Sequence, residues 1–233
     1  METKQKEIRE LSKKHPKLET LMYRVNKDSL KQVHTAQMQK KASGIDGVTK
    51  QDYEKNLDEN LEELIKRMKT FSYRPQPVRR TYIPKGNGKM RPLGIPAYED
   101  RLVQGVMANI LNEVYEPRFL DCSYGFRPGR SAHDAIRDIN QTLMCRRVNY
   151  ILDCDIKGFF DNVNHEWLMK FLEHDIADKN FLRYVKRFLK AGIMEKGVYS
   201  ESSVGTPQGG QISPVLANVY LHYVLDLWFE KAV

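Results

Sequence analysis

The sequence lacks long apolar runs and has few cysteines. An uninterrupted hydrophobic stretch of about 18 residues, which a membrane-spanning helix needs, occurs nowhere in its 233 residues, and the N-terminal segment METKQKEIRELSKKH is charged throughout. The three cysteines are odd in number, widely spaced and form no C-x-x-C pair. They indicate a reducing compartment and no zinc site. We therefore expect a soluble cytoplasmic protein with no membrane partner.

Internal repeats and low-complexity tracts are also absent. With 41% hydrophobic and 10% aromatic residues, the chain has enough apolar material to build a core. Thirty-eight Lys and Arg residues against 30 Asp and Glu residues give a formal charge of +8. This charge favours a polyanionic partner, although many basic proteins bind no nucleic acid.

The spacing of apolar residues predicts mostly helices, with a few short strands. Residues 1–41 form a small helical extension in this prediction. Further helices are expected within 50–70 and over 98–116, 131–147, 165–175, 178–190 and 214–232. Strands are expected over 78–83, 90–95, 149–156 and 193–200. Because these elements show no regular strand–helix–strand alternation, the predicted fold class is α+β.

Two glycine-containing turns separate some of these elements. KGNGK reads as the basic tip of a hairpin between the strands 78–83 and 90–95. GTPQGGQIS, residues 205–213, reads as a glycine-rich turn before the last helix.

The stretch YILDCDIKGFFDNVNH, residues 150–165, has two aspartates at the end of an apolar run. In a strand, Asp153 and Asp155 share one face, and the opposite face is apolar and expected to be buried. Clustered carboxylates need a cation, a donor or a proton, and Mg²⁺ prefers oxygen ligands. Both aspartates could equally be solvent-facing strand residues. The D-x-D spacing also occurs in sugar-nucleotide transferases, so the spacing alone does not identify the kind of site.

Four long motifs in series resemble one family. YIPKGNGKMRPLGIP, YGFRPGRSAHDAI, DCDIKGFFDNVNHEWL and GTPQGGQISPVLANVYLH, in this order, are similar to the reverse transcriptases encoded by group II introns, the intron maturases. The resemblance extends from about SGIDGVT to the last residue. It implies a right-hand polymerase with interleaved fingers and palm, which copies an intron RNA template from a DNA or RNA primer using dNTPs and Mg²⁺.

The resemblance assigns roles within DIKGFFD. Asp155 matches the first catalytic palm aspartate, which is also a metal ligand, and the carbonyl of Ile156 matches a backbone metal ligand. Phe160 matches the aromatic residue that stacks under the sugar and excludes a 2′-hydroxyl. Asp153 matches no catalytic position.

The hairpin and the glycine-rich turn match substrate-binding positions of the family. Lys85 and Arg91 match the fingers residues that bind the incoming triphosphate, as a point charge and a bidentate fork respectively. Gln208 matches the glutamine near the dNTP, and Gly209 lets backbone approach the substrate. A plain tight turn would also explain the glycine.

The loop YGFRPGR has two further candidates. Arg127 and Arg130 are interpreted as contacts to template or primer phosphates. Ion pairing within the fold is an alternative for each. Phe126 and Phe159 could stack on bases or belong to the core. His165 and Glu166 look like the start of a zinc-protease motif, but Met169 stands where the second histidine would be, so that reading is rejected.

The sequence departs from the family in one respect. A complete member has a second palm hairpin, Tyr/Phe-x-Asp-Asp, soon after the helix that follows PQGG, and here no two aspartates are adjacent. We therefore expect this chain by itself to be inactive in DNA synthesis, either as a shortened form of a longer enzyme or as a natural fragment. Surface left uncovered at the last helix could drive homodimerisation.

The resemblance also predicts the division of the chain. Residues 1–42 form an N-terminal helical extension, 43–148 the fingers, including the basic hairpin 78–95 and running into the palm, and 149–233 a partial palm interleaved with fingers helices. The favoured function is RNA-directed DNA polymerase. The alternative is a non-catalytic RNA-binding module that helps the intron to splice.

Overall fold

The computed structural model describes residues 2–84, 86, 88–206 and 209–232. Its helices and helical turns are α1 (Glu2–Lys14), η1 (Met22–Arg24), α2 (Lys27–Ala36), α3 (Lys50–Glu54), α4 (Leu57–Lys69), α5 (Tyr98–Tyr115), α6 (Ala132–Cys145), α7 (Phe159–Asn162), α8 (His165–Asp175), α9 (Lys179–Leu189), α10 (Ser213–Leu221), η2 (His222–Asp226) and α11 (Leu227–Ala232). Its strands are β1 (Val78–Pro84), β2 (Met90–Ile95), β3 (Ile193–Glu195) and β4 (Val198–Ser200). The α+β prediction is confirmed.

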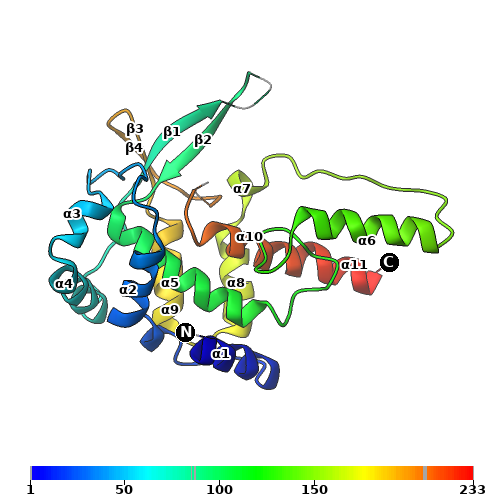
Figure 1. The fold of residues 1–233 in the computed structure, drawn as a ribbon, viewed down its shortest axis with the longest axis horizontal. Helices are drawn as coiled ribbons and strands as arrows, with labels where there is room; N and C mark the ends of the chain where they lie inside the picture. Colours follow the sequence, from blue (N-terminus) through cyan, green and yellow to red (C-terminus); the bar gives the residue numbers. More distant parts are fainter. Residues whose placement is uncertain (1, 85, 87, 207–208, 233) are drawn as a thin grey trace.

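Helix α5 is the central element of the core (Figure 1). Most of its residues are buried, and Leu102, Met107 and Leu111 have no exposed surface. The helices α1, α2 and α10 pack against it, and α8 packs against both α9 and α10. A helix that is apolar on nearly every side is stable only when neighbours cover every side. The sequence of α5 therefore places it in the middle of the molecule.

A small mixed sheet lies at one end of this helical body. Its strand order is β2-β1-β3-β4, with β1 antiparallel to β2, parallel to β3, and β3 antiparallel to β4. The β1–β2 hairpin projects away from the body beyond β3 and β4 (Figure 1). Its prediction is confirmed, whereas the single strand expected over 193–200 is a hairpin of two short strands.

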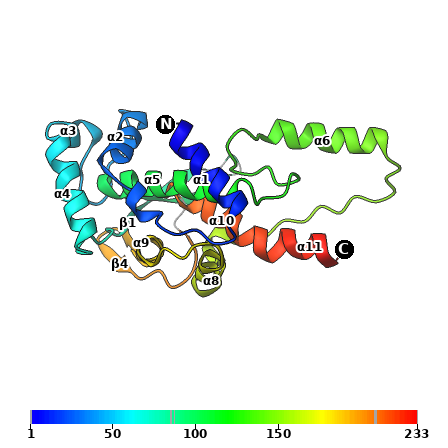
Figure 2. The ribbon, with the colours of Figure 1, turned by 90° about the horizontal axis from the view of Figure 1, so that it is seen from below.

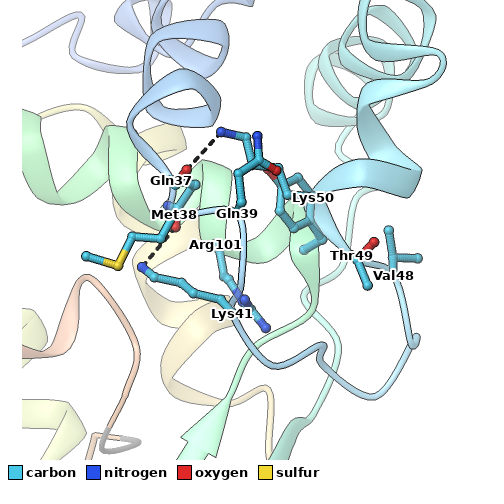
Figure 3. A pocket seen from close by; sticks show the side chains of 9 residues that line it. Gln37, Met38, Gln39, Lys41, Val48, Thr49, Lys50 and Arg101 are labelled. Atoms are coloured by element: carbon cyan, nitrogen blue, oxygen red, sulfur yellow. Dashed lines mark hydrogen bonds between the residues drawn. The ribbon is translucent and has the colours of Figure 1, made fainter.

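The N-terminal extension is tied to the body by polar contacts as well as by apolar packing. The hydroxyl of Ser12 donates to the carbonyl of Val114 on α5 at 2.6 Å. Near the end of α2, Gln37 accepts twice, at its backbone oxygen from Lys50 Nζ at 2.8 Å and at its side-chain oxygen from Lys41 Nζ at 3.1 Å (Figure 3). The hollow between these side chains has no room for a ligand.

Local capping signals in the sequence predict several helix starts correctly. Ser131 and Asp134 form a reciprocal capping box at α6, and the side chain of Asn164 accepts from the backbone of α8. Asp178 accepts from two backbone N–H groups at the start of α9. The short helix α7 was not expected from the sequence, because four residues are too few for a periodic pattern.

The predicted strand over residues 149–156 is wrong. The segment is extended but pairs with no described strand, and both of its faces are exposed, including Tyr150 at 94% and Leu152 at 88%. It runs beside α6, which itself has no buried residue and stands away from the body (Figures 1 and 2). A strand needs a neighbouring strand for its backbone hydrogen bonds, and none of the described residues supplies one here.

The last predicted helix is confirmed over its length but only partly in its packing. Leu216 and Val219 are buried in the core, as expected. After α10 the chain makes the π-helical turn η2 and continues as α11, where Trp228 and Phe229 are more than half exposed. Val224, expected against the core, is also exposed. Within the described part of the chain, no helix is long and apolar enough to cross a bilayer.

Candidate functional site

The glycine-rich turn that precedes α10 is anchored to the segment containing α7. Gly205 has a φ of +81°, and a Cβ there would lie 2.8 Å from the carbonyl oxygen of Asp161. The next residue, Thr206, donates its N–H to the carbonyl of Phe160 at 2.7 Å. His165 Nε2 donates to the carbonyl of Gly205 at 2.6 Å. The turn therefore lies directly against FFD, and only glycine permits this approach.

The other end of the turn lies against the β1–β2 hairpin and the central helix α5. Gly209 has a φ of +113°, and a Cβ there would collide with the carbonyl oxygen of Gly94 and lie 2.9 Å from Leu93 Cδ1 on β2. The N–H of Gln211 donates to the side chain of Gln104 on α5 at 3.0 Å. One turn thus joins the base of the hairpin, about 115 residues before it in the sequence, to α7, about 45 residues before it.

Phe160 lies where the motif segments meet. It is half-buried on α7, which begins after Gly158 in the left-handed conformation. Its ring is edge-on to Phe159 at 5.7 Å and to Phe126 of the YGFRPGR loop at 6.0 Å between centroids. Phe126 is nonetheless 65% exposed, so it leaves an open aromatic surface beside Phe160. Phe159 points to Tyr220 of α10 instead, at 6.1 Å.

Asp155 lies in the exposed extended segment before α7. Its carboxylate makes no hydrogen bond or ion pair with any described residue, and the neighbouring Ile156 is 49% exposed. The expectation that the apolar face of this segment is buried is wrong, because the segment has no strand partner. Asp155 thus lies five residues before Phe160 in the sequence, in a segment that belongs to no described sheet.

The structure describes two of the four residues expected to bind the dNTP at the hairpin and the turn, Arg91 and Gly209. Arg91 is exposed on β2, opposite Ile83 in the hairpin register. Lys85 and Gln208 lie outside the described residues. Gly209 is described, and its contact with β2 places the turn close to the strand of Arg91.

The geometry favours the ion-pair alternative for Arg127. This residue is 6% exposed, and its guanidinium binds Glu116 through two hydrogen bonds, Nε to Oε2 at 3.2 Å and Nη2 to Oε1 at 2.8 Å. Its remaining nitrogen donates to the carbonyls of Leu120 and Ser123 at 2.6 and 2.7 Å. All three guanidinium nitrogens of Arg127 donate inside the fold, which uses four of its five N–H groups. Arg127 therefore shapes the loop, and its burial keeps it from a phosphate in solution.

Arg130 has a more open position in the same loop. It pairs with Asp121 at 2.7 Å, and its guanidinium lies 5.4 Å from the centre of the Tyr124 ring. The Asp121 side chain is fully exposed. Because an exposed ion pair contributes little, a phosphate could displace Asp121 at small cost.

A cavity of about 310 Å³ adjoins the turn on its inner side. It lies between the hairpin, the end of α9 and residues 202–206, and its walls include Arg80, Asp161 and Thr206. The hydroxyl of Thr206 is buried and has no hydrogen-bond partner among the described residues. The turn is therefore bordered by the FFD segment on one side and by a partly polar cavity on another.

The donor chemistry fits a divalent metal ion only in part. Asp155 supplies a carboxylate and Ile156 a carbonyl, which are oxygen ligands of the kind that Mg²⁺ binds. The residues that the structure describes contain no group of three His, Cys, Asp or Glu side chains able to hold a metal. These two ligands alone do not make a metal site.

Sequence reasoning missed two contacts that hold the site together. His165, considered only as a zinc ligand and rejected, is the donor that holds Gly205. Gln104, inside an apolar helix, holds the other end of the turn. A buried glutamine in the middle of α5 was a usable signal, because a buried polar side chain needs a partner.

Comparison with known proteins identifies the pattern. Residues 83–232 match the family described as Reverse transcriptase (RNA-dependent DNA polymerase). The chain is 45% identical over 175 residues to the Group II intron-encoded protein LtrA of Lactococcus lactis subsp. cremoris, covering 73% of this chain and 29% of the relative. It is 42% identical over 182 residues to Protein YkfC of Escherichia coli (strain K12), covering 77% of this chain and 48% of the relative.

A solved structure has a similar fold. A chain of the partial Cas6-RT-Cas1–Cas2 complex matches 89% of this chain with a TM-score of 0.56 at 21% identity, covering 34% of that chain. The chain spans less than half the length of each curated relative described above.

Proposed function

We propose a function from one premise, which the family match over residues 83–232 establishes: the chain belongs to the reverse transcriptase (RNA-dependent DNA polymerase) family. We infer that it acts within an RNA-directed DNA polymerase encoded by a group II intron. The observation that supports this most directly is the convergence on Phe160. The YGFRPGR and GTPQGG segments both contact this residue of DIKGFFD, and the turn also contacts the hairpin strand of Arg91.

Each part of the candidate site has a role in this proposal. Asp155 and the carbonyl of Ile156 are ligands of a divalent ion, taken to be Mg²⁺, which when bound would neutralise triphosphate charge and activate the attacking hydroxyl. Phe160 lies under the sugar of the incoming dNTP. Arg91 binds its triphosphate as a bidentate fork, with Lys85 as a point charge.

The glycine-rich turn forms the remaining side of the dNTP site in this proposal. Gln208 contacts the sugar and phosphates, and Gly209 keeps the turn close to β2. Arg130 contacts a phosphate of template or primer. Arg127 supports the same loop from within the fold, through Glu116.

The wider assignment follows the family resemblance. We propose residues 1–42 as the N-terminal extension, 43–148 as fingers and 149–233 as a partial palm. The partners are intron RNA as template, a DNA or RNA primer and dNTPs, and the site of action is the cytoplasm. Binding of the intron RNA to aid splicing and retrohoming is a second role of the same protein, supported by the likeness to an intron-encoded relative.

Primer extension by the full-length protein tests the polymerase assignment. Asp155→Ala is compared with Asp153→Ala, because both carboxylates are exposed in the same segment and only Asp155 matches a catalytic position. We expect Asp155→Ala to lower extension by more than about 100-fold, since a metal ligand should matter more than the outer-shell partners that cost about 10–100-fold. Asp153→Ala should stay within about twofold of the unchanged protein.

Two outcomes would contradict this assignment. Unchanged extension after Asp155→Ala removes Asp155 from the site. An equal loss in both variants points to a structural effect of the segment.

If neither variant nor the unchanged protein extends a primer but all bind intron RNA, the non-catalytic splicing module is the better description. We also expect the 233-residue chain alone to show no extension, because the residues that the structure describes contain no group of side chains able to hold a metal.

A further inference from the structure

The outer face of α9 is unusually basic. The charged side chains that it exposes include Lys179, Arg183 and Lys186, and Lys190 follows directly after its last turn. Residues 179–189 contain no acidic residue. Because Arg183, Lys186 and Lys190 are separated by three and four positions, they lie on one side of the helix.

The segment after α4 adds cations to the same face. The hydroxyl of Tyr184 on α9 donates to the carbonyl of Met68 at 2.7 Å, and Arg187 Nη1 donates to the carbonyl of Tyr73 at 2.7 Å. These bonds hold the exposed residues Lys69 and Arg74 beside α9. We call Lys69, Arg74, Arg183, Lys186 and Lys190 the α4–α9 basic surface.

The charge of this surface is not neutralised within the fold. None of its five cations makes an ion pair with a described residue. Three lysines on the other side of α4 are paired with carboxylates: Lys27 and Lys31 with Asp58, and Lys55 with Asp52. Concentrated positive charge without carboxylates is costly through self-repulsion and creates a potential that attracts polyanions.

Two arginines are held in place by aromatic rings. The guanidinium of Arg183 lies 4.0 Å from the centre of the Phe71 ring, and that of Arg187 lies 5.1 Å from the centre of the Tyr184 ring. Burial raises the pKa of Tyr184, and the positive charges of Arg183 and Arg74 oppose this shift, so both lie close to it. A guanidinium stacked on a ring keeps its N–H edge available and loses little freedom on binding a phosphate.

The α4–α9 basic surface lies far from the segment that contains Asp155. Figures 1 and 2 show α4 at the end of the body opposite to α6, with α9 between α4 and α8. The last residues of α9, Phe188 and Leu189, line the cavity beside the glycine-rich turn, and Lys190 follows them. None of the five cations is among the residues assigned to the metal, the dNTP or the template.

We propose that the α4–α9 basic surface binds the phosphate backbone of a structured RNA. Phe71 is its one large apolar side chain with substantial exposure among the described residues, at 37%, whereas membrane-surface helices need a broad apolar face. The choice of RNA among polyanions rests on the proposed function. The position and charge of the surface do not depend on it.

A matched pair of triple variants tests the proposal in the full-length protein. Lys69→Gln, Lys186→Gln and Lys190→Gln together remove three charges from the surface. Lys27→Gln, Lys31→Gln and Lys55→Gln together remove three charges from lysines that are paired with carboxylates. Both triples change the net charge equally. The probe is an RNA stem–loop of arbitrary sequence, titrated at several KCl concentrations.

We expect the surface triple to bind the stem–loop at least about tenfold more weakly at low salt, and the slope of log affinity against log salt to fall by about two to three. The control triple should stay within about twofold in affinity. Equal effects of the two triples, or no effect of the surface triple, would overturn the proposal. Loss of binding to phosphatidylserine vesicles with unchanged RNA affinity would overturn it in favour of a membrane.

Primer extension on a short primer–template separates this proposal from the polymerase assignment. The surface triple should retain extension within about twofold, because none of its residues is assigned to the metal, the dNTP or the template. If the protein extends no primer but the two triples differ in RNA affinity as expected, the polymerase assignment is contradicted and the RNA-binding proposal is supported. Circular dichroism melts confirm that both triples are folded before the affinities are compared.

Discussion

Arg127 and Arg130 stand three residues apart in one loop and have different surroundings. Arg127 is enclosed, and each of its three guanidinium nitrogens donates to Glu116 or to a backbone carbonyl. Arg130 is paired only with the exposed Asp121. A loop residue with a charge is a candidate for binding, but the partner that compensates it inside the fold decides whether it is available.

Replacing Arg127 should therefore affect stability, not binding. Arg127→Gln leaves Glu116 without its partner, and breaking such a buried pair typically costs about 3–5 kcal/mol of unfolding free energy. Urea unfolding measures the loss. Arg130→Gln serves as the comparison, with an expected cost below about 1 kcal/mol. A larger loss of stability for Arg130→Gln than for Arg127→Gln would show that the two roles are reversed.

Asp100 is the carboxyl group most affected by its surroundings. It is 2% exposed, accepts from the hydroxyl of Tyr73 and accepts from the N–H of Gln76 at 2.8 Å. Burial raises the pKa of Asp100 to about 7, against the lowering effect of both hydrogen bonds, and the nearby charges of Glu99 and Asp46 add to the rise. The folded chain thus keeps a proton that the unfolded chain has lost.

This shift predicts a pH dependence of stability. Below about pH 4 the carboxyl is protonated in both states; between about pH 4 and about pH 7 only the folded chain retains the proton. The free energy of unfolding should therefore fall as pH rises through this window, by at most about 1.4 kcal/mol per pH unit for this one group.

Asp100→Asn provides the comparison, since an amide does not titrate. Urea unfolding of both proteins between about pH 4.5 and about pH 7.5 isolates the contribution. The stability of the variant should fall less steeply with pH across this window, because its side chain has no proton to lose. Parallel pH profiles would contradict the raised pKa.

At the scale of elements, the turn between β4 and α10 joins parts that are distant in sequence. It contacts α7 through Gly205, β2 through Gly209 and α5 through Gln211. Both glycines have positive φ and carbonyl oxygens at the place where a side chain would begin. The turn can approach two other elements because these positions have no Cβ.

Gly209→Ala should disturb this junction more than a glycine replacement elsewhere. Its Cβ would collide with the carbonyl of Gly94, so β2 or the turn must shift. We expect a loss of about 2 kcal/mol or more in unfolding free energy. Gly47→Ala is the control: its φ is +70° but nothing lies within 4 Å of the added Cβ, so only backbone strain of about 1 kcal/mol is expected. Equal losses would show that strain alone matters at Gly209.

At the scale of the whole molecule, one end is well packed and the other is open. Figure 2 shows α6, the chain after it and α11 at this open end. These elements expose large apolar side chains, among them Ile139, Tyr150 and Trp228. Exposed apolar side chains gathered on neighbouring elements often mark a surface for association. We therefore propose that the 233-residue chain associates with itself through this end, as a homodimer.

Light scattering tests this association. The chain should show a concentration-dependent increase in mass, and Ile136→Ser with Ile139→Ser and Leu143→Ser should reduce it. These three side chains are exposed on a helix with no buried residue, so their replacement should leave the melting temperature nearly unchanged. A monodisperse monomer at high concentration would contradict the proposal.

The sequence by itself determined the features that depend on neighbouring residues. Apolar spacing predicted α5, capping residues such as Ser131 and Asp178 predicted helix starts, and the order of the motifs identified the family. These signals act within a few positions of the chain, so no tertiary information is needed to read them.

Only the tertiary structure decided which partners distant residues have. Arg127 forms an ion pair with Glu116, and His165 donates a hydrogen bond to the carbonyl of Gly205. Residues 149–156 pair with no described strand. An apolar run with alternating polar residues forms a strand only when another strand accepts and donates its backbone hydrogen bonds. The sequence of the run does not say whether such a strand lies beside it. Asp155 shows the same difference. Its motif can be recognised from neighbouring residues in the sequence, whereas the position of its carboxylate depends on neighbours in space that the described residues do not provide.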